Sequence, residues 1–137
     1  PKEAFNNVMK DAGKLSGIDF HSGDYRDLTI PENSIVYCDP PYEGTKEYIE
    51  AKKSGFSSEE FFIWARLQIV SGNKLFISEY HAPDDFICIW EKPVKSSLSA
   101  NGVAGGSKSS TERLFIHESQ ATRRHKRLSR KIGVSVE

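Results

Sequence analysis

The stretch SIVYCDPPY, residues 34–42, decides how this chain folds and where its chemistry lies. Its first half is a nearly continuous run of apolar residues, which is typical of a strand buried on both faces of a sheet. The run ends at Asp39, which two prolines and a tyrosine follow. Ligands of open α/β sheets bind outside the carboxyl ends of the strands. The sequence therefore predicts a ligand site beside Asp39.

The two prolines set the chemistry of this strand end. Pro40 and Pro41 have no N–H and hold the backbone extended, which leaves the Pro40 carbonyl free beside the Asp39 carboxylate. Tyr42 adds an aromatic face. A planar heterocycle with an exocyclic amino group, such as adenine, would satisfy the two acceptors and the ring together. The other interpretation is a proline-rich strand exit with a capping aspartate.

Hydrophobic patterning divides the rest of the chain into helices and strands. Residues 2–15 have helical spacing, residues 43–55 have loop character, and a capping box of Ser57 with Glu60 precedes a helix that Gly72 ends. The predicted strands are residues 18–25, 34–39, 74–80, 86–92 and 113–119. Alternating helices and strands favour parallel pairing, whereas the last two strands, with no helix between them, predict a hairpin. We expect an α/β fold with a mixed sheet, parallel in its middle, and one antiparallel strand at an edge.

Composition narrows the class of protein. The chain has 137 residues, 28% of them charged, which fits one globular domain. No apolar run approaches the ~20 residues that span a bilayer, and no signal peptide is visible, so the sequence predicts a cytoplasmic protein without a membrane partner. Cys38 and Cys88 lie in apolar runs, where reduced thiols are the expectation over a disulfide. Because the chain opens within a helical pattern at Pro1, we expect a piece of a longer protein.

Charge is balanced overall but unevenly distributed. Lys and Arg number 19, as do Asp and Glu, yet residues 121–137 hold six basic residues and one acid. We treat residues 121–137 as a basic C-terminal tail after a core of residues 1–120. The tail either contacts phosphates or is a solvated, frayed terminus. The Ser- and Gly-rich stretch 93–111 is either a functional loop or a disordered connection.

Several motifs, in order along the chain, resemble those of one enzyme family. VYCDPPY, residues 36–42, resembles the catalytic motif of S-adenosylmethionine-dependent amino-methyltransferases, in the form typical of Dam-type N6-adenine DNA methyltransferases. VKSSLSANG, residues 94–102, followed by TERLFIHE, residues 111–118, resembles the family's last loop and strand. FHSGDYRDL, residues 20–28, is similar to its acidic and aromatic cofactor motif, though more weakly.

The resemblance implies a Rossmann-like methyltransferase fold and methyl transfer from S-adenosylmethionine to N6 of adenine in duplex DNA. It implies that Asp39, Pro40, Pro41 and Tyr42 are the catalytic residues. The Asp39 carboxylate and the Pro40 carbonyl would accept hydrogen bonds from the target amino group, and Tyr42 would stack on the flipped base. The reaction requires no metal and no covalent intermediate. A bacterial or phage origin is implied too.

The resemblance also assigns residues to the two substrates. Asp24, Tyr25 and Asp39 would contact the cofactor. The residues that would hold nucleic acid are Tyr42, Lys95, Ser97, Ser99 and Asn101. Glu79, at the end of a central strand, is close to this site by position.

One family motif is missing from the sequence. The glycine-rich cofactor loop, F-x-G-x-G, is absent, and in the family this loop and the DNA-reading domain precede DPPY. The chain therefore resembles a C-terminal catalytic portion, incomplete at its N-terminal side, whose partner would be the missing N-terminal part. Two alternatives stay open. One is an RNA base methyltransferase with the same motif, and the other is an inactive fragment that binds nucleic acid or needs a partner chain.

Overall fold

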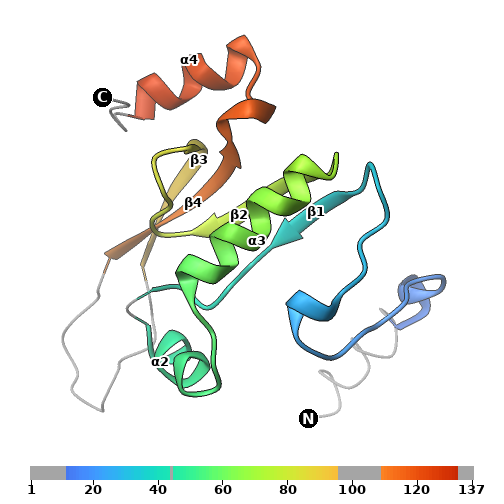
Figure 1. Cartoon of the computed structure of the whole chain (residues 1–137). Coiled ribbons are helices and arrows are strands. Elements are labelled where there is room, and N and C mark those ends of the chain that lie inside the picture. Colours follow the sequence, from blue (N-terminus) through green and yellow to red (C-terminus); the bar gives the residue numbers. More distant parts are fainter. Residues whose placement is uncertain (1–11, 44, 96–108, 133–137) are drawn as a thin grey trace, which may run out of the picture.

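The structure, a computed structural model, describes residues 12–43, 45–95 and 109–132. Its strands are β1 (Ile35–Cys38), β2 (Lys74–Glu79), β3 (Phe86–Lys95) and β4 (Ser109–His117). They form a four-stranded sheet in the order β1-β2-β4-β3 (Figure 1). β1 and β2 are parallel, whereas β4 is antiparallel to both β2 and β3. The fold is therefore α/β with a mixed sheet, in which β4 alone is reversed.

The predicted hairpin of the last two strands is confirmed, but its place in the sheet differs from the expectation. β4 pairs with β2 on one side and with β3 on the other, so the reversed strand is internal and β3 is the edge. The middle of the sheet is therefore antiparallel. This order depends on pairing between residues far apart in the chain, which local patterning does not contain.

The strand predicted over residues 18–25 is wrong. Among the described residues, this segment contains no strand and ends in a short 3₁₀ helix, η2 (Tyr25–Asp27). The Asp24 carboxylate caps η2 by accepting the Arg26 N–H at 2.9 Å. An aspartate that bonds the backbone two residues ahead favours a turn over a strand.

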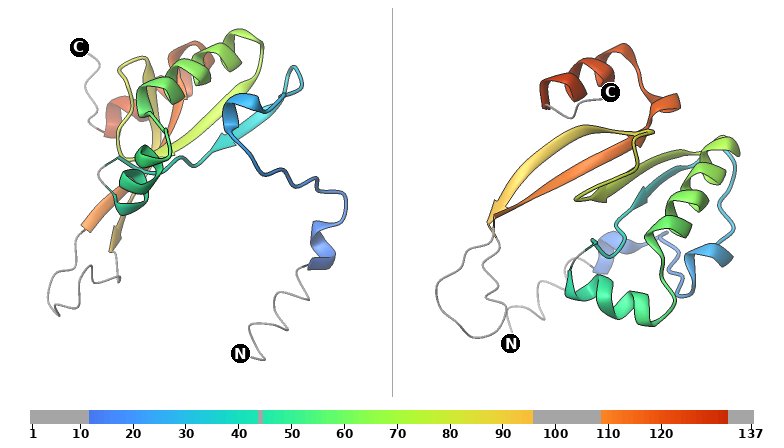
Figure 2. Two further views of the ribbon diagram at one scale, coloured as in Figure 1. Left: turned by 60° about the horizontal axis from the view of Figure 1, so that its bottom comes forward. Right: turned by 60° about the vertical axis from the view of Figure 1, so that its left-hand side comes forward.

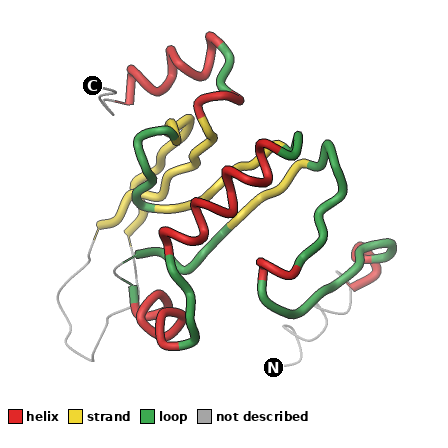
Figure 3. The backbone as a smooth tube through the Cα atoms, viewed as in Figure 1, coloured by secondary structure: helices red, strands yellow, loops and turns green. Residues whose placement is uncertain are grey.

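In the described residues the α-helices are α2 (Lys46–Lys53), α3 (Ser58–Val70) and α4 (Arg123–Ile132), as Figure 3 shows by colour. The predicted limits of α3 are confirmed. The Ser57 hydroxyl accepts the Glu60 N–H at 3.3 Å, and Gly72 ends the helix with a φ of +91°. Only Gly tolerates such a φ without strain, so its position fixes the helix end. The Glu60 carboxylate completes no capping box, because it pairs with Arg26 instead.

The loop predicted over residues 43–55 is wrong, because it contains α2. Thr45 caps α2, since its hydroxyl oxygen accepts the Tyr48 N–H at 3.2 Å. The helix has no buried residue, so it lacks the apolar stripe by which an amphipathic helix is recognised. The predicted helix over residues 2–15 lies mostly outside the described residues.

The core lies between the sheet and α3. Leu75 and Ile77 of β2 pack with Phe61 and Ala65 of α3, and Phe115 of β4 joins them. Side chains alternate along a strand, so the neighbouring pair Ile87 and Ile116 points to the opposite face. That pair is buried too. In Figure 2, α3 runs alongside β1 and β2, whereas α4 packs against β3.

Candidate functional site

A pocket of about 300 Å³ opens at the carboxyl end of β1. Asp39, Pro40 and Pro41 line it together with Tyr25 of η2. The other lining residues are apolar or aromatic: Leu28, Ile30, Val36, Tyr37, Cys38, Phe56, Phe61 and Trp64. Apolar walls with a few polar groups are the usual construction of a small-molecule site.

Aromatic side chains from the start of α3 pack against Tyr25. Its ring meets Trp64 edge-on, with centroids 5.2 Å apart, and Phe61 at 5.8 Å. Phe61 and Trp64 stack on each other at 5.9 Å. Residues three apart lie on the same side of a helix, so Phe61 and Trp64 both face Tyr25 from the first two turns of α3. Burial raises the pKa of Tyr25, so its hydroxyl stays neutral.

Tyr42 is not among the residues that line the pocket. Its ring is half-buried and meets Tyr80 edge-on, with centroids 4.7 Å apart. Burial raises the pKa of Tyr42 well above its usual range, and a hydrogen bond from its hydroxyl to the Asp39 carboxylate adds to that rise. A hydrogen bond with the Ser78 side chain lowers the pKa of Tyr42 and offsets part of this rise. Tyr42 therefore orients the Asp39 carboxylate, and the structure places Asp39, Pro40 and Pro41, but not Tyr42, at the pocket.

Glu79 fastens the segment that follows the motif. Its side chain is only 3% exposed, at the end of β2. Its carboxylate accepts the Glu43 N–H at 2.9 Å and also the Tyr80 N–H. Burial raises the pKa of Glu79, and these two N–H donors lower it. The chain immediately after Tyr42 is thus held to the neighbouring strand.

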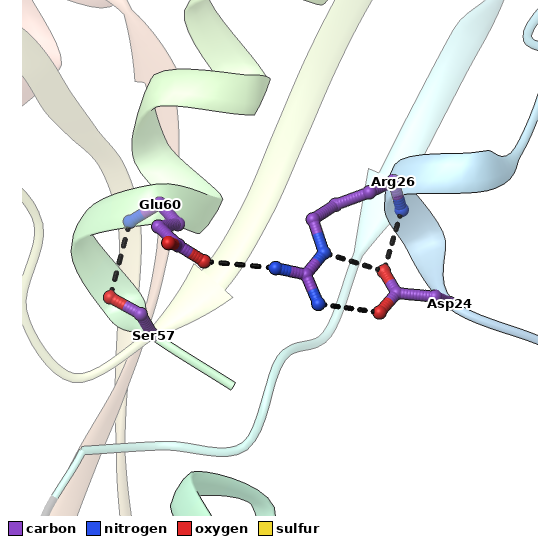
Figure 4. A network of polar contacts seen from close by, with 4 residues as sticks. All are labelled: Asp24, Arg26, Ser57 and Glu60. Carbon is purple, nitrogen blue, oxygen red and sulfur yellow. Dashed lines mark hydrogen bonds and ion pairs between the residues drawn. The ribbon is translucent and has the colours of Figure 1, made fainter. Parts of the chain in front are cut away.

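Asp24 is engaged by Arg26 and does not line the pocket (Figure 4). Its carboxylate accepts hydrogen bonds from Arg26 Nε at 2.9 Å and Nη2 at 2.7 Å. These bonds lower the pKa of Asp24 to about 2. Arg26 Nη1 also donates to Glu60 at 3.0 Å, in the first turn of α3. This network fastens η2, which carries Tyr25, to α3.

The predicted nucleic-acid residues are only partly within the described structure. Lys95 is the last residue of β3. Because β1 and β3 run in the same direction, their carboxyl ends lie at the same edge of the sheet, and Lys95 lies at the edge that carries Asp39. Ser97, Ser99 and Asn101 lie outside the described residues.

The wall residues Phe56, Phe61 and Trp64 were not predicted as site residues. Phe61 and Trp64 lie three residues apart in α3, and Phe56 precedes the helix. The spacing of the first two is visible in the sequence, but helical spacing alone does not separate a pocket wall from core packing. The distinction depends on Tyr25, which packs against this face of α3 beside the Arg26–Glu60 ion pair.

Other kinds of site are not apparent in the part of the chain that the structure describes. There, no three His, Cys, Asp or Glu side chains gather closely enough to hold a metal ion. None of the helices in the described ranges has the length and apolar character needed to cross a membrane. Cys38 and Cys88 are both free thiols.

Comparison with known proteins gives no family. The chain matches no family model, and searches of curated proteins and of solved structures find no match either.

Proposed function

We propose that this chain forms the acceptor side of a methyltransferase that transfers a methyl group from S-adenosylmethionine to N6 of adenine in DNA. The observation that carries the proposal is that Asp39, Pro40 and Pro41 line one pocket with the half-buried ring of Tyr25. Aromatic and apolar walls suit a planar base, and Asp39 and Pro40 bring a carboxylate and a carbonyl, both acceptors, to the lining of the same pocket. The mixed sheet with one reversed strand is compatible with the Rossmann-like methyltransferase fold that the sequence resemblance implies.

In this proposal the Asp39 carboxylate and the Pro40 carbonyl accept the two N–H groups of the target amino group. The N6 lone pair is normally delocalised into the ring, and these hydrogen bonds favour its localisation on nitrogen. They also stabilise the positive charge that develops on N6 during transfer. Tyr42 keeps the Asp39 carboxylate oriented, and Glu79 keeps the motif segment at the end of β2.

The residues present fit the cofactor in part. Tyr25 and Asp39 line the pocket and would contact S-adenosylmethionine, which supplies an electrophilic methyl group when bound. Asp24 is held by Arg26 and would act through the position of Tyr25. The glycine-rich loop of the family is absent from the sequence. We therefore propose that the missing N-terminal part of the protein would supply the rest of the cofactor site.

The test is incorporation of a labelled methyl group from S-adenosylmethionine into unmethylated duplex DNA. Asp39→Ala should lower the rate at least 100-fold, or about 2.7 kcal/mol, as expected for loss of one electrostatic contact to a developing charge. Asp84→Ala, which removes an exposed carboxylate outside the pocket lining, is the matched control and should leave the rate unchanged. A near-normal rate in Asp39→Ala would contradict the proposal, and incorporation into ribosomal RNA alone would favour the RNA alternative.

A second candidate, a chain that acts only with a partner, is favoured by the open edge of β1. Ile35 is 75% exposed, and Tyr37 is 62% exposed on the same strand. Calorimetric titration of S-adenosylmethionine into this chain separates the two candidates. Heat of binding with one site supports the first, and no heat together with no methyl incorporation supports the second.

A further inference from the structure

The basic residues of α4 form a single stripe along one side of the helix. At about 100° per residue, all six lie within an arc of roughly 160°. They are Arg123, Arg124, Lys126, Arg127, Arg130 and Lys131, and every one is exposed. The helix contains no acidic residue. The tail is thus an ordered helix over residues 123–132, and its charge is concentrated on one face.

The opposite side of α4 is used for packing. Ser129 is buried, Leu128 and Ile132 are half-buried, and Ile132 contacts the core. α4 packs against β3 (Figure 2). His125 and Thr122 cap its start, since the His125 N–H donates to Thr122 Oγ1 and the Thr122 N–H to His125 Nδ1, each at 3.3 Å. The orientation of the helix is therefore fixed, and the basic stripe faces away from the sheet.

The six positive charges of the stripe repel one another, and α4 has no acidic residue to offset them. Like charges three or four residues apart, such as Arg123 with Arg127 and Arg127 with Lys131, each cost about 0.2–0.5 kcal/mol. Arg123 and Arg124 also lie in the first turn, where the helix dipole disfavours cations. In the described part of the chain none of the six side chains makes an ion pair. An external row of anions would remove this repulsion.

We propose that α4 binds the phosphodiester backbone of a double-stranded nucleic acid. The helix is about 15 Å long, and a duplex presents one phosphate charge per ~1.7 Å of its axis, so up to about nine phosphate charges lie within that length. Six cations on one face match this density of charge. A membrane surface fits less well, because an interfacial helix needs a free apolar face and that of α4 is packed against the protein. The inference is drawn from α4 alone and does not depend on methyl transfer.

The test compares binding of a 20-base-pair duplex, by fluorescence anisotropy, across a series of salt concentrations. The stripe variant is Arg123→Gln with Arg127→Gln and Arg130→Gln. Each lost phosphate contact lowers the slope of log affinity against log salt by about 0.9, so the slope should fall by two to three. Affinity at low salt should fall at least tenfold. The matched control, Lys46→Gln with Lys52→Gln and Lys74→Gln, removes the same charge from other exposed sites and should change the slope by less than one.

Two further measurements complete the test. Thermal unfolding of the stripe variant should occur at the same or a higher temperature, since repulsion is removed, which shows that lost binding is not lost folding. DNA and RNA duplexes in separate arms identify the source of the phosphates. An equal fall in slope for both variants would overturn the proposal. So would equally tight, stripe-dependent binding of polyglutamate or of phosphatidylserine vesicles, which would assign the stripe to an acidic protein or a membrane.

Discussion

At the scale of single residues, Glu79 is the buried carboxylate that joins the motif segment to the sheet. Its carboxylate accepts hydrogen bonds from two backbone N–H groups, those of Glu43 and Tyr80. Leaving two buried donors unpaired costs about 1–3 kcal/mol each. The Glu79 side chain therefore contributes to the stability of the fold, and it also helps to position Asp39 by holding the segment that follows the motif.

Replacing Glu79 should reveal this role in the pH dependence of unfolding. Because burial raises its pKa in the folded state, Glu79 binds its proton more tightly when folded. Its contribution is fully present below the unfolded pKa of about 4.5 and is lost as pH rises through the folded pKa. In urea unfolding, the free energy of unfolding of Glu79→Gln relative to the wild type should therefore be higher at pH 7 than at pH 4. An identical difference at both pH values would contradict this.

The same measurement separates charge from hydrogen bonding. Glu79→Ala leaves both N–H donors without an acceptor and should destabilise the protein at both pH values by about 2–6 kcal/mol. Glu118, which is exposed, supplies the control, and Glu118→Ala should change the unfolding free energy little.

The motif residues show how far single positions were predictable. Asp39, Pro40 and Pro41 were placed at a ligand site because strand ends and prolines are read directly from sequence, and they do line the pocket. Asp24 and Tyr42 do not line the pocket. Asp24 is bonded to Arg26, and Tyr42 lies beside Tyr80. These partners depend on tertiary geometry, so residue type alone did not indicate them.

At the scale of elements, the contact between η2 and α3 determines whether the pocket has its Tyr25 wall. Arg26 is shared by Asp24 in η2 and by Glu60 in α3 (Figure 4). All three side chains are exposed, so the network contributes orientation more than stability.

Asp24→Asn should weaken this contact in a pH-dependent way. Its hydrogen bonds with Arg26 lower the pKa of Asp24 from its ordinary value of 3.8 to about 2, so its contribution is present above pH 3.8 and is lost as pH falls toward 2. The difference in urea midpoint between the wild type and Asp24→Asn should therefore shrink from pH 5 to pH 2. Asp27→Asn, in the same 3₁₀ helix, is the control and should show no such trend.

Of the α-helices in the described residues, α3 was predicted, whereas α2 and α4 were not. A serine cap and a terminal glycine delimit α3 in the sequence as they do in the structure. α2 has a cap but no buried face, so its sequence looks like a polar loop. Local capping specified that helix without the hydrophobic periodicity on which sequence interpretation mainly relies.

At the scale of the whole molecule, apolar side chains remain exposed on two elements. On α3, Ile63, Leu67 and Val70 lie on one side of the helix at spacings of four and three, and Val70 is 84% exposed. On the edge strand β1, Ile35 is 75% exposed. An open strand edge and an apolar helix stripe both favour association with another surface.

We expect the isolated chain to self-associate through these surfaces. Ile35→Lys with Val70→Lys should lower the average mass in sedimentation velocity at high protein concentration. The thermal midpoint should stay within a few degrees, because neither side chain is buried. Lys46→Gln with Lys52→Gln is a control for surface changes elsewhere and should not lower the mass. Unchanged association in the lysine variant would exclude these surfaces.

The α/β class, the mixed sheet and the terminal hairpin followed from the order of elements in the sequence. The internal position of β4 did not follow. The chain between β3 and β4 is long enough for β4 to return on either side of β3. β4 lies between β3 and β2 because Phe115 pairs with Ile77 of β2. These two residues are 38 positions apart in the chain.

Cys38 in the pocket wall has a consequence for reagent chemistry. Burial raises its pKa to about 11, so only about one thiol in 10⁴ is ionised at pH 7. Cys88 is fully buried. Alkylation in mild alkali should therefore begin at Cys38, and any molecule that fills the pocket should slow it. The protein thus contains a built-in reporter of pocket occupancy, which needs neither a dye nor a turnover assay.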